Sequence, residues 1–511
     1  MSVENPAARR IVNDPALTAS QKARYLSLEA ENALAYPELD SHTRAALDDR
    51  VICDMYEGHA PYKPRYVLPD YNVVLTRGSD WLELPTPQSL EEAIHTLMVA
   101  YHHVPSVTGM PVYIGQLDDL LLPFCDGVSD ERLYQQIKLF WRYLDRVLPD
   151  AFMHANIGPS DNRVARAILR VDAELKQIAP NLTFFYDPEV SSDDILQIAA
   201  ANIAECSKPH IANHPLHDAV FGERGYGIVS CYNALPVCGG ASTLTRVNLA
   251  KVAERSEDVT DFLDNKLPQY VDLNFRLTEA RIDYLFNQSG FMDSFLVTEG
   301  WLDETRFAAM FGIFAMAEAV NTLQDKAGAA GRYGHDAGAN ALGHKISARL
   351  AQLVASRPMK NVWQGRAMLH SQAGLSTDEG FTPGVRIPYG TEPDPVSHIR
   401  ALAAHHEFYS SGISEILTLD ETVKANPAAI RDLCKGAFAL GFREFTANVA
   451  SNDLVRVTGY MIRLSDVEKF NAEAGSRTNT TALGAEAADV TSILDRKPRV
   501  VAHELFAGAG Q

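Results

Sequence analysis

The chain has 511 residues, of which 46% are hydrophobic and 22% are charged, a composition typical of a globular protein with a sizeable core. A formal net charge of −19 without any basic run argues against nucleic acid and anionic membrane as partners, because both select clustered Lys and Arg. No window reaches the roughly 18 apolar residues of a membrane span, and residues 1–17 lack the apolar core of a signal peptide. We therefore expect a soluble, cytoplasmic protein that binds a small molecule.

Helical patterns dominate the first third of the chain. Residues 89–103 begin with Ser89 three positions before Glu92, the spacing of a capping box. Residues 129–148 and 161–180 carry apolar side chains every three or four positions, and the second run ends at Pro180. These three segments are predicted helices.

Strands and helices alternate from residue 181 onward. The sequence predicts a short buried strand at 181–188, a helix at 193–206, and a strand that runs into a loop at 225–233. The alternation continues through residues 242–256, 278–289, 306–323 and 428–449. Neither a proline- or serine-rich linker nor a repeat of 20 to 50 residues interrupts the pattern, so we expect one large α/β domain, with its short strands in a barrel.

Several familiar motifs are incomplete. Residues 338–345, GANALGHK, have His344 where a phosphate-binding loop requires lysine, and the glycines at 328, 331 and 334 are wrongly spaced for a dinucleotide site. The pairs His214/His217 and His405/His406 lack the His-Glu-x-x-His arrangement of a zinc protease. The six cysteines form no Cys-x-x-Cys pair, which is typical of reduced thiols. We expect no bound metal and no bound organic cofactor.

A cysteine stands at the end of the predicted strand 225–233. Cys231 lies in a loop with Pro236 and the pair Gly239-Gly240, a setting that can present a reactive side chain from a rigid scaffold. Buried free cysteines are usually inert, and no basic residue adjoins Cys231 to stabilise a thiolate. Taken alone, the loop therefore leaves a structural role open.

A second stretch near the C-terminus changes this interpretation. Residues 456–460 read Arg-Val-Thr-Gly-Tyr, with Gly459 between residues of high strand propensity, where glycine marks a bulge, a bend or a close approach. The stretch resembles the Arg-Val-x-Gly-Tyr signature of glycyl radical enzymes at every fixed position. Residues 306–320 and the cysteine loop with the following residues 243–249 look like the corresponding parts of anaerobic ribonucleotide reductases. The whole chain, including residues 51–71, 150–162 and 476–481, is most similar to the YjjI family.

This resemblance implies a fold and a division of the chain. The fold would be an α/β barrel of about ten short strands surrounded by helices, with the cysteine and glycine loops meeting inside. Residues 1–511 would form one large domain, in which 1–180 is mostly helical, 181–440 is the barrel with the cysteine loop, and 441–511 is the glycyl radical region.

The resemblance also implies an anaerobic radical enzyme. An S-adenosylmethionine-dependent activating enzyme would install a radical on Gly459, which would generate a thiyl radical on Cys231. The thiyl radical would abstract hydrogen from a small polar metabolite. Glycine suits the first step because a side chain would obstruct a planar, delocalised radical. A homodimer is expected from the same resemblance, and Cys238 is the alternative thiyl site.

Three departures from better-characterised relatives bear on the reaction. Position 233 is Asn, so the glutamate of the Cys-x-Glu pattern is missing, and Tyr232 replaces the second cysteine of an adjacent pair. An ATP-binding cone and a four-cysteine zinc site are not recognisable. The alternatives to the leading hypothesis are ribonucleotide-reductase-like reduction and a catalytically silent binding or scaffold relative.

Six polar residues are candidates for the substrate pocket. Glu318 is expected inside an apolar helix over 311–323, as either a general base with a raised pKa or the partner of a buried arginine. The other candidates are His210, Asn213, His217, Tyr409 and Glu415.

Overall fold

The structure of the chain is a computed structural model, which describes most of its residues. The described residues are 5–15, 19–32, 34–54, 62–106, 111–148, 152–222, 224–371, 378, 380–413, 415–456, 459, 461–465 and 468. Of the quoted signature, Arg456 and Gly459 are described, whereas residues 457, 458 and 460 lie outside the described residues, as does the stretch 476–481.

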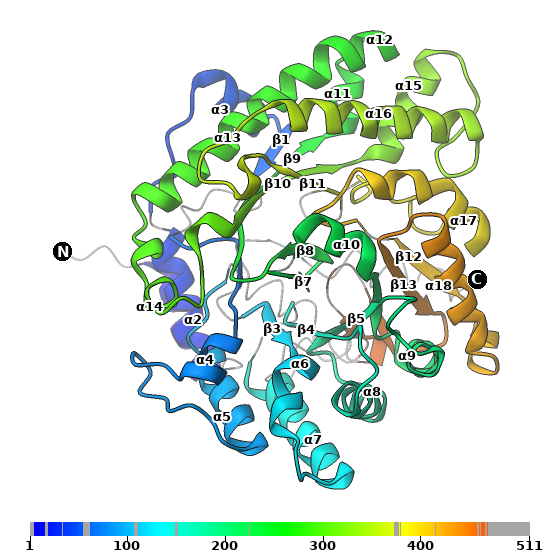
Figure 1. Ribbon diagram of the computed structural model, residues 1–511. Helices are drawn as coiled ribbons and strands as arrows, with labels where there is room; N and C mark the ends of the chain where they lie inside the picture. Colours follow the sequence, from blue (N-terminus) through cyan, green and yellow to red (C-terminus); the bar gives the residue numbers. More distant parts are fainter. Residues whose placement is uncertain are drawn as a thin grey trace.

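Eighteen α-helices and fifteen strands occur in the described part of the chain (Figure 1). The helices are α1 Pro6–Asn13, α2 Ala19–Asn32, α3 Ser41–Asp48, α4 Asn72–Arg77, α5 Leu90–Tyr101, α6 Leu117–Leu121, α7 Asp130–Val147, α8 Arg163–Leu175, α9 Asp193–Cys206, α10 His214–Phe221, α11 Leu249–Glu254, α12 Val259–Asp261, α13 Leu267–Asn287, α14 Phe295–Thr298, α15 Met316–Lys326, α16 Ala337–Ser356, α17 Pro395–Leu402 and α18 Ala428–Ala439. The strands are β1 Ile52–Asp54, β2 Tyr66–Leu68, β3 Tyr113–Gln116, β4 His154–Ile157, β5 Asn181–Tyr186, β6 His210–Asn213, β7 Tyr226–Val229, β8 Asn233–Pro236, β9 Gly239–Asn248, β10 Phe307–Phe314, β11 Met368–His370, β12 Ile416–Leu419, β13 Glu444–Val449, β14 Leu454–Arg456 and β15 Met461–Arg463.

Two mixed sheets carry most of the strands. One has the order β1-β9-β10-β11, with β2 also paired to β9; the other has the order β12-β13-β6-β5-β4-β3. In the second sheet β3 to β6 run parallel, and β13 lies antiparallel to β6. The pairs β7–β8 and β14–β15 are separate antiparallel hairpins. The α/β prediction is confirmed, but the strand order does not close into a hydrogen-bonded ring among the described residues.

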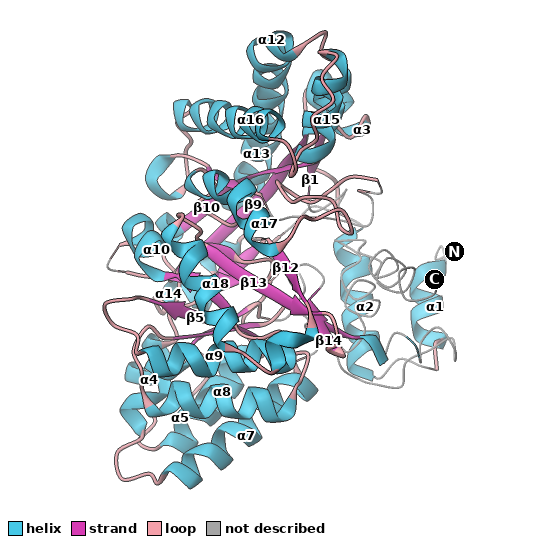
Figure 2. Ribbon diagram, turned by 90° about the vertical axis from the view of Figure 1, so that its right-hand side faces the viewer, coloured by secondary structure: helices cyan, strands magenta, loops and turns pink. Residues whose placement is uncertain are grey.

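The two sheets lie around the β7–β8 hairpin, with helices outside them (Figure 1). In the turned view, α5, α7, α8 and α9 gather at one end, α13, α15 and α16 gather at the other, and the strands lie between them (Figure 2). The three domain segments expected from the sequence stay a prediction. Strand β3 pairs with β4, and β4 pairs with β5, so strands from the first 180 residues belong to the same sheet as strands that follow them.

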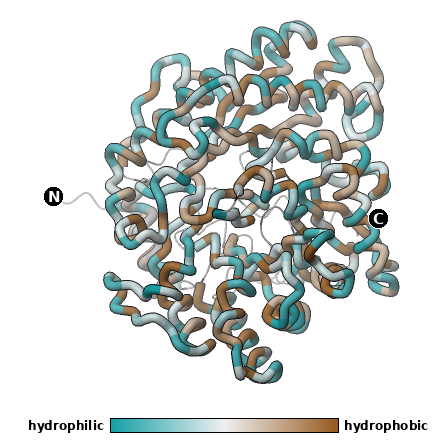
Figure 3. The backbone as a smooth tube through the Cα atoms, in the orientation of Figure 1, coloured by the Kyte–Doolittle hydropathy of each residue, from teal (hydrophilic) through white to brown (hydrophobic). Residues whose placement is uncertain are grey.

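Amphipathic helices enclose the sheets. Helix α7 is capped by Ser129, whose hydroxyl accepts a hydrogen bond from Arg132 N at 3.3 Å. The helix buries Leu133, Ile137, Phe140, Trp141 and Leu144. That three-and-four spacing places one apolar face toward the sheets. Along the outer helices, hydrophobic and hydrophilic stretches alternate (Figure 3). All six residues of β5 are buried, as expected for a parallel strand covered on both faces.

One helix prediction is wrong in its boundary. Residues 307–314 form the buried strand β10, which pairs with β9 and β11, and helix α15 starts only at Met316. A short continuous apolar run fits a fully buried strand as well as a buried helix, and parallel pairing with distant strands decides the outcome here. Glu318 therefore lies in the first turn of α15.

Candidate active site

Cys231 lies in the tight turn of the β7–β8 hairpin. Val229 pairs with Asn233, so Ser230, Cys231 and Tyr232 form the connection. Ser230 and Tyr232 both have positive φ, 51° and 59°, a conformation that costs non-glycine residues about 1–3 kcal/mol each. Backbone strain of this kind clusters at functional sites, and here it flanks the cysteine on both sides.

A buried asparagine holds the hairpin among the sheets. Asn156 on β4 accepts a hydrogen bond from Ile228 N and donates one to Ile228 O, both at 2.9 Å. On the other strand of the hairpin, Ala234 N donates to Ser411 O at 3.2 Å. The hairpin therefore has direct hydrogen bonds to the surrounding structure on both of its strands.

The structure brings Gly459 against Cys231. Gly459 is buried in the connection between β14 and β15, and a Cβ atom built on it would lie 2.5 Å from Cys231 Sγ. Because a carbon–carbon single bond spans about 1.5 Å, the Gly459 α-carbon itself lies within about 4 Å of that sulfur. The built Cβ would also overlap the backbone N and Cα of Cys231, so no side chain fits at position 459 without a shift.

The rest of the thiol environment is buried and polar. Cys231 is 2% exposed, and Ser230 Oγ lies 3.8 Å from its sulfur. Arg386 interacts electrostatically with Cys231, Tyr232 and Glu415; burial lowers the pKa of Arg386, and these three neighbours act in the opposite direction. Arg386 therefore interacts with the thiol even though no charged residue adjoins Cys231 in sequence.

The hairpin separates the alternative cysteine from Gly459. Cys238 follows β8 at the end where Pro236 pairs with Tyr226, one strand length from the turn that holds Cys231. A strand of four residues spans about 13 Å. Cys238 is 6% exposed, its sulfur lies 3.9 Å from Gly300 O, and it lines a cavity of about 310 Å³ together with Asp70 and Arg224.

His210 and His217 both contact a glutamate that the sequence analysis missed. His210 Nε2 lies 2.6 Å from Glu444 Oε2, His217 Nε2 lies 3.0 Å from Glu444 Oε1, and all three side chains have no solvent exposure. Burial raises the pKa of Glu444 well above its usual range and lowers the pKa values of His210 and His217 well below theirs. Burial thus favours the neutral forms of the carboxyl and of both imidazoles.

Hydrogen bonds connect the group of His210, His217 and Glu444 to further buried side chains near the cysteine turn. Thr183 Oγ1 lies 3.0 Å from His210 Nδ1 and 2.6 Å from His154 Nε2, so five buried side chains form one polar chain. The ring of Tyr232 lies over His210, with centroids 4.1 Å apart. His210 therefore touches the residue that follows Cys231.

The remaining candidates lie in separate surroundings. Glu318 Oε1 accepts a hydrogen bond from Thr382 N at 3.0 Å, and burial raises its pKa; its hydrogen-bond partner is Thr382 rather than an arginine. Tyr409 is hydrogen-bonded to Ser347 at 2.8 Å. Asn213 donates to Phe442 O at 2.9 Å.

Glu415 is the candidate with the clearest link to the thiol. Its Oε2 lies 3.3 Å from His398 Nε2, and Glu415 interacts with Arg386, which in turn interacts with Cys231. The sequence analysis missed Glu444 and Arg386, although each had one usable signal in the sequence. Glu444 is a carboxylate within an apolar strand, and Arg386 is an arginine between prolines and glycines.

The histidine pairs considered for metal binding have other partners. His405 is hydrogen-bonded to Tyr333 and Ser347, and His406 accepts from Arg443 N. Across the described residues, no group of three or more His, Cys, Asp or Glu side chains is arranged to hold a metal ion. None of the described helices has the length and apolar character needed to cross a membrane.

Solved structures share this fold. Hydroxyproline dehydratase from Clostridioides difficile matches with a TM-score of 0.69 at 12% identity, over 89% of this chain and 86% of that one. The anaerobic ribonucleotide reductase from Thermotoga maritima matches with a TM-score of 0.64 at 13% identity, over 84% and 85%. The B12-independent glycerol dehydratase from Clostridium butyricum matches with a TM-score of 0.61 at 13% identity, over 83% and 80%. These likenesses define the α/β fold of glycyl radical enzymes.

Sequence comparison identifies the family within that class. The chain belongs to the YjjI-like glycyl radical enzymes, whose family model, described as "Glycyl radical enzyme YjjI-like", matches residues 17–499. It is 60% identical to the uncharacterized protein YjjI of Escherichia coli (strain K12), over 97% of this chain and 96% of that protein. It is 36% identical to an uncharacterized protein of Haemophilus influenzae, over 94% and 95%. The family resemblance predicted from the sequence is confirmed.

Proposed function

We propose that the protein is an anaerobic glycyl radical enzyme in which Gly459 stores the radical and Cys231 delivers it to the substrate. The observation that carries this proposal is the contact between them: a Cβ at Gly459 would lie 2.5 Å from Cys231 Sγ. Contact at this range allows direct transfer of a hydrogen atom, and burial of both residues excludes water from the intermediates.

Each step of the proposed cycle moves one hydrogen atom. A radical S-adenosylmethionine activating enzyme removes a hydrogen atom from the Gly459 α-carbon. The Gly459 radical then takes the hydrogen atom of the Cys231 thiol, which restores the glycine and leaves a thiyl radical. The thiyl radical takes a hydrogen atom from a substrate C–H bond, and the product radical recovers one from the thiol. Homolysis of S–H requires no thiolate, so no basic neighbour is needed.

A small polar metabolite is the substrate class that the surroundings favour. Glu415 Oε1 and Asn233 Oδ1 are buried acceptors that receive no hydrogen bond from the described residues. Buried acceptors without donors are costly, and substrate hydroxyl or amine groups would satisfy them. Asn233 Nδ2 donates to Val229 O at 2.9 Å, so at the position where many relatives have glutamate the side chain closes the hairpin.

The proposal also covers the enclosure of the site, the location of the protein and its oligomeric state. We propose a barrel-like enclosure in which the cysteine and glycine loops meet, a cytoplasmic location, and a homodimer. Sedimentation of a monomer alone at micromolar concentration would refute the dimer without affecting the radical chemistry. Dehydratases and ribonucleotide reductases share the fold, so the fold does not separate elimination from reduction.

The decisive experiment needs no substrate. The protein is activated anaerobically with its activating enzyme, reductant and S-adenosylmethionine, and electron paramagnetic resonance should show a doublet from the remaining α-hydrogen. Protein labelled with [2-13C]glycine should add a carbon splitting, which assigns the radical to a glycine α-carbon. A protein that stays diamagnetic with an activating enzyme of verified activity would refute the proposal.

Deuterium oxide tests the role of Cys231. The thiol exchanges with solvent, so repeated transfer between sulfur and Gly459 should replace the α-hydrogen by deuterium and collapse the doublet. Cys231→Ser should keep the doublet in deuterium oxide, because a hydroxyl hydrogen is held too strongly. In the matched control Cys238→Ser, the doublet should collapse as it does in the wild type. If the doublet collapsed in Cys231→Ser and persisted in Cys238→Ser, Cys238 rather than Cys231 would be the thiol that exchanges hydrogen with Gly459.

A further inference from the structure

The Gly459 carbonyl has a specific side-chain partner. Asn181, the first residue of β5, donates from Nδ2 to Gly459 O at 2.9 Å and has no solvent exposure. The acceptor is the carbonyl bonded directly to the α-carbon that would carry the radical. Spin on that carbon delocalises onto this oxygen, so a donor at the oxygen acts on the radical itself.

The other end of the Asn181 amide is occupied by the signature arginine. Arg456 Nη1 donates to Asn181 Oδ1 at 3.1 Å, and Arg456 Nη2 donates to Ser207 O at 3.2 Å. The guanidinium lies 5.2 Å from the ring centroid of Tyr232, the residue after Cys231. Arg456 is 2% exposed. Asn181 is therefore held in one orientation by a group that also contacts the cysteine turn.

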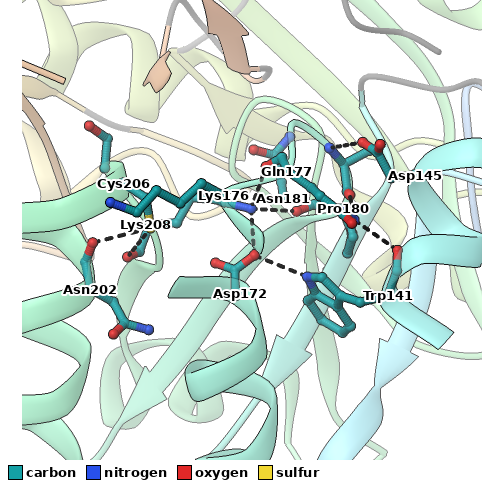
Figure 4. Close-up of polar contacts among 12 residues, drawn as sticks. Trp141, Asp145, Asp172, Lys176, Gln177, Pro180, Asn181, Asn202, Cys206 and Lys208 are labelled. Atoms are coloured by element: carbon teal, nitrogen blue, oxygen red, sulfur yellow. Dashed lines mark hydrogen bonds and ion pairs between the residues drawn. The ribbon is translucent and has the colours of Figure 1, made fainter. Parts of the chain in front are cut away.

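A buried ion pair fixes the chain that leads into Asn181. Lys208 Nζ donates to Asp172 Oδ1 at 2.6 Å, to Gln177 O at 2.9 Å and to Pro180 O at 3.2 Å, which uses all three ammonium hydrogens. Figure 4 shows Asp172 between Lys208 and Trp141, whose Nε1 donates to the same carboxylate at 3.0 Å. Both charged side chains have no solvent exposure.

The glycine hairpin packs against the same region through apolar contacts. Leu454 and Met461, which flank the glycine connection on β14 and β15, form a buried cluster with Ile178 and Cys206. The main chain of Asn181 is fixed as well, since its N donates to Met153 O at 2.8 Å. The position of Asn181 is thus set from several directions before it meets Gly459.

We propose that Asn181 is the positioning residue of the radical glycine. Its amide holds the Gly459 α-carbon against Cys231 and draws spin density toward the Gly459 carbonyl oxygen, while Arg456 orients the amide. This inference rests on the proposed function, because it assigns a role toward the Gly459 radical.

Side-chain labelling tests the contact in the wild type. Protein with 15N in the asparagine side-chain amides is activated, and pulsed electron paramagnetic resonance should detect a weak coupling between the radical and one 15N nucleus. The coupling should vanish in Asn181→Asp, which replaces the donor by an acceptor. It should persist in Asn202→Asp, the matched control, because buried Asn202 donates to Leu169 O at 2.7 Å instead.

The same variants test the consequence of the contact. Asn181→Asp should enlarge the α-hydrogen splitting and slow the collapse of the doublet in deuterium oxide by at least tenfold, whereas Asn202→Asp should match the wild type in both. A labelled wild type with a radical but without the 15N coupling would overturn the inference alone, even if no Asn181 variant folds. A wild type without any radical would overturn the proposed function as well.

Discussion

The close approach of Gly459 to Cys231 determines what a side chain at residue 459 would do. The neighbouring Cys231 leaves no room for a Cβ atom at residue 459, and this contact is the reason that glycine is required there. A methyl group would overlap the sulfur, the backbone N and the Cα of Cys231. Loss of a radical signal in Gly459→Ala therefore combines two effects, a displaced turn and an altered radical site.

We expect Gly459→Ala to destabilise the protein even when it is never activated. Overpacking of a tight site typically costs 1–3 kcal/mol. Thermal unfolding should show a lower midpoint, and adding Cys231→Ala should restore only part of it, because backbone atoms of residue 231 also meet the methyl group. A midpoint unchanged from the wild type would contradict the close approach.

Glu444 offers a prediction from its protonation. Its pKa is raised in the folded protein, so the stability it contributes is full below the unfolded value near 4.5 and is lost as the pH rises through the folded value. Glu444→Gln keeps the shape and does not titrate. Between the unfolded value near 4.5 and the folded pKa, the stability of the variant relative to the wild type should rise with pH, by up to about 1.4 kcal/mol per pH unit.

Thermal unfolding of both proteins at pH 5, 6 and 7 measures this difference. In the unfolded state His210 and His217 titrate alike in both proteins, so that part of the pH dependence cancels in the comparison. A difference that stays constant with pH would mean that the folded wild type binds no extra proton at this site, so that Glu444 is ionised beside two neutral imidazoles.

The short linear signature at residues 456–460 singles out Gly459, and the family resemblance pairs it with Cys231; their roles stay predictions. Glu444 could not be predicted from the sequence, since its role depends on His210 and His217 across more than two hundred positions. Asn181 has no local signal at all, because an asparagine at a strand start is ordinary until Gly459 lies against it.

The β7–β8 hairpin depends on hydrogen bonds with the Asn156 side chain, because its own strands are too short to hold it. Strands of four residues give few hydrogen bonds, and among the described strands β7 and β8 pair only with each other. An isolated two-stranded hairpin is marginal in water. The two bonds between the Asn156 side chain and the Ile228 backbone, together with the bond from Ala234 N to Ser411 O, therefore hold the cysteine turn in place.

Asn156→Ala should loosen the hairpin and impair hydrogen transfer. Two buried backbone groups would lose their partners, at roughly 1–3 kcal/mol each. The variant should have a lower thermal midpoint and, once activated, a slower collapse of the doublet in deuterium oxide. Asn202→Ala, which removes one buried side-chain donor elsewhere, should be destabilised without a change in the collapse rate.

The elements that could be predicted are those with strong local signals. Residues 193–206 form α9 with the predicted bounds, and the Ser89 hydroxyl caps α5 by accepting from Glu92 N at 3.2 Å. By contrast, β8 is the four residues Asn-Ala-Leu-Pro, whose pairing with β7 no periodicity indicates. The β10–α15 boundary depends on parallel pairing with β9 and β11, which lies outside any local window.

At the scale of the whole molecule, two distant parts of the chain must fold before the site exists. The cysteine turn comes from the middle of the chain, and the glycine connection comes from its last strands. The six-stranded sheet links them, because β13 pairs with β6 and Asn448 on β13 accepts from Arg456 N at 2.8 Å. The contact between Gly459 and Cys231 therefore depends on the assembled sheet, and we expect a fragment of the chain to lack the proposed radical site.

The proposed location of the radical on Gly459 predicts what happens when the activated protein is exposed to air. Oxygen should attack the Gly459 radical and cleave the backbone there, which would separate the chain into a large fragment ending near residue 458 and a small one from residues 460–511. Mass spectrometry of both fragments locates the cut. Cys231→Ser should be cleaved as readily as the wild type because the radical resides on Gly459, whereas unactivated protein should stay intact. Cleavage at another residue would move the radical away from Gly459, and an activated chain left whole by air would show that the glycine stores no radical.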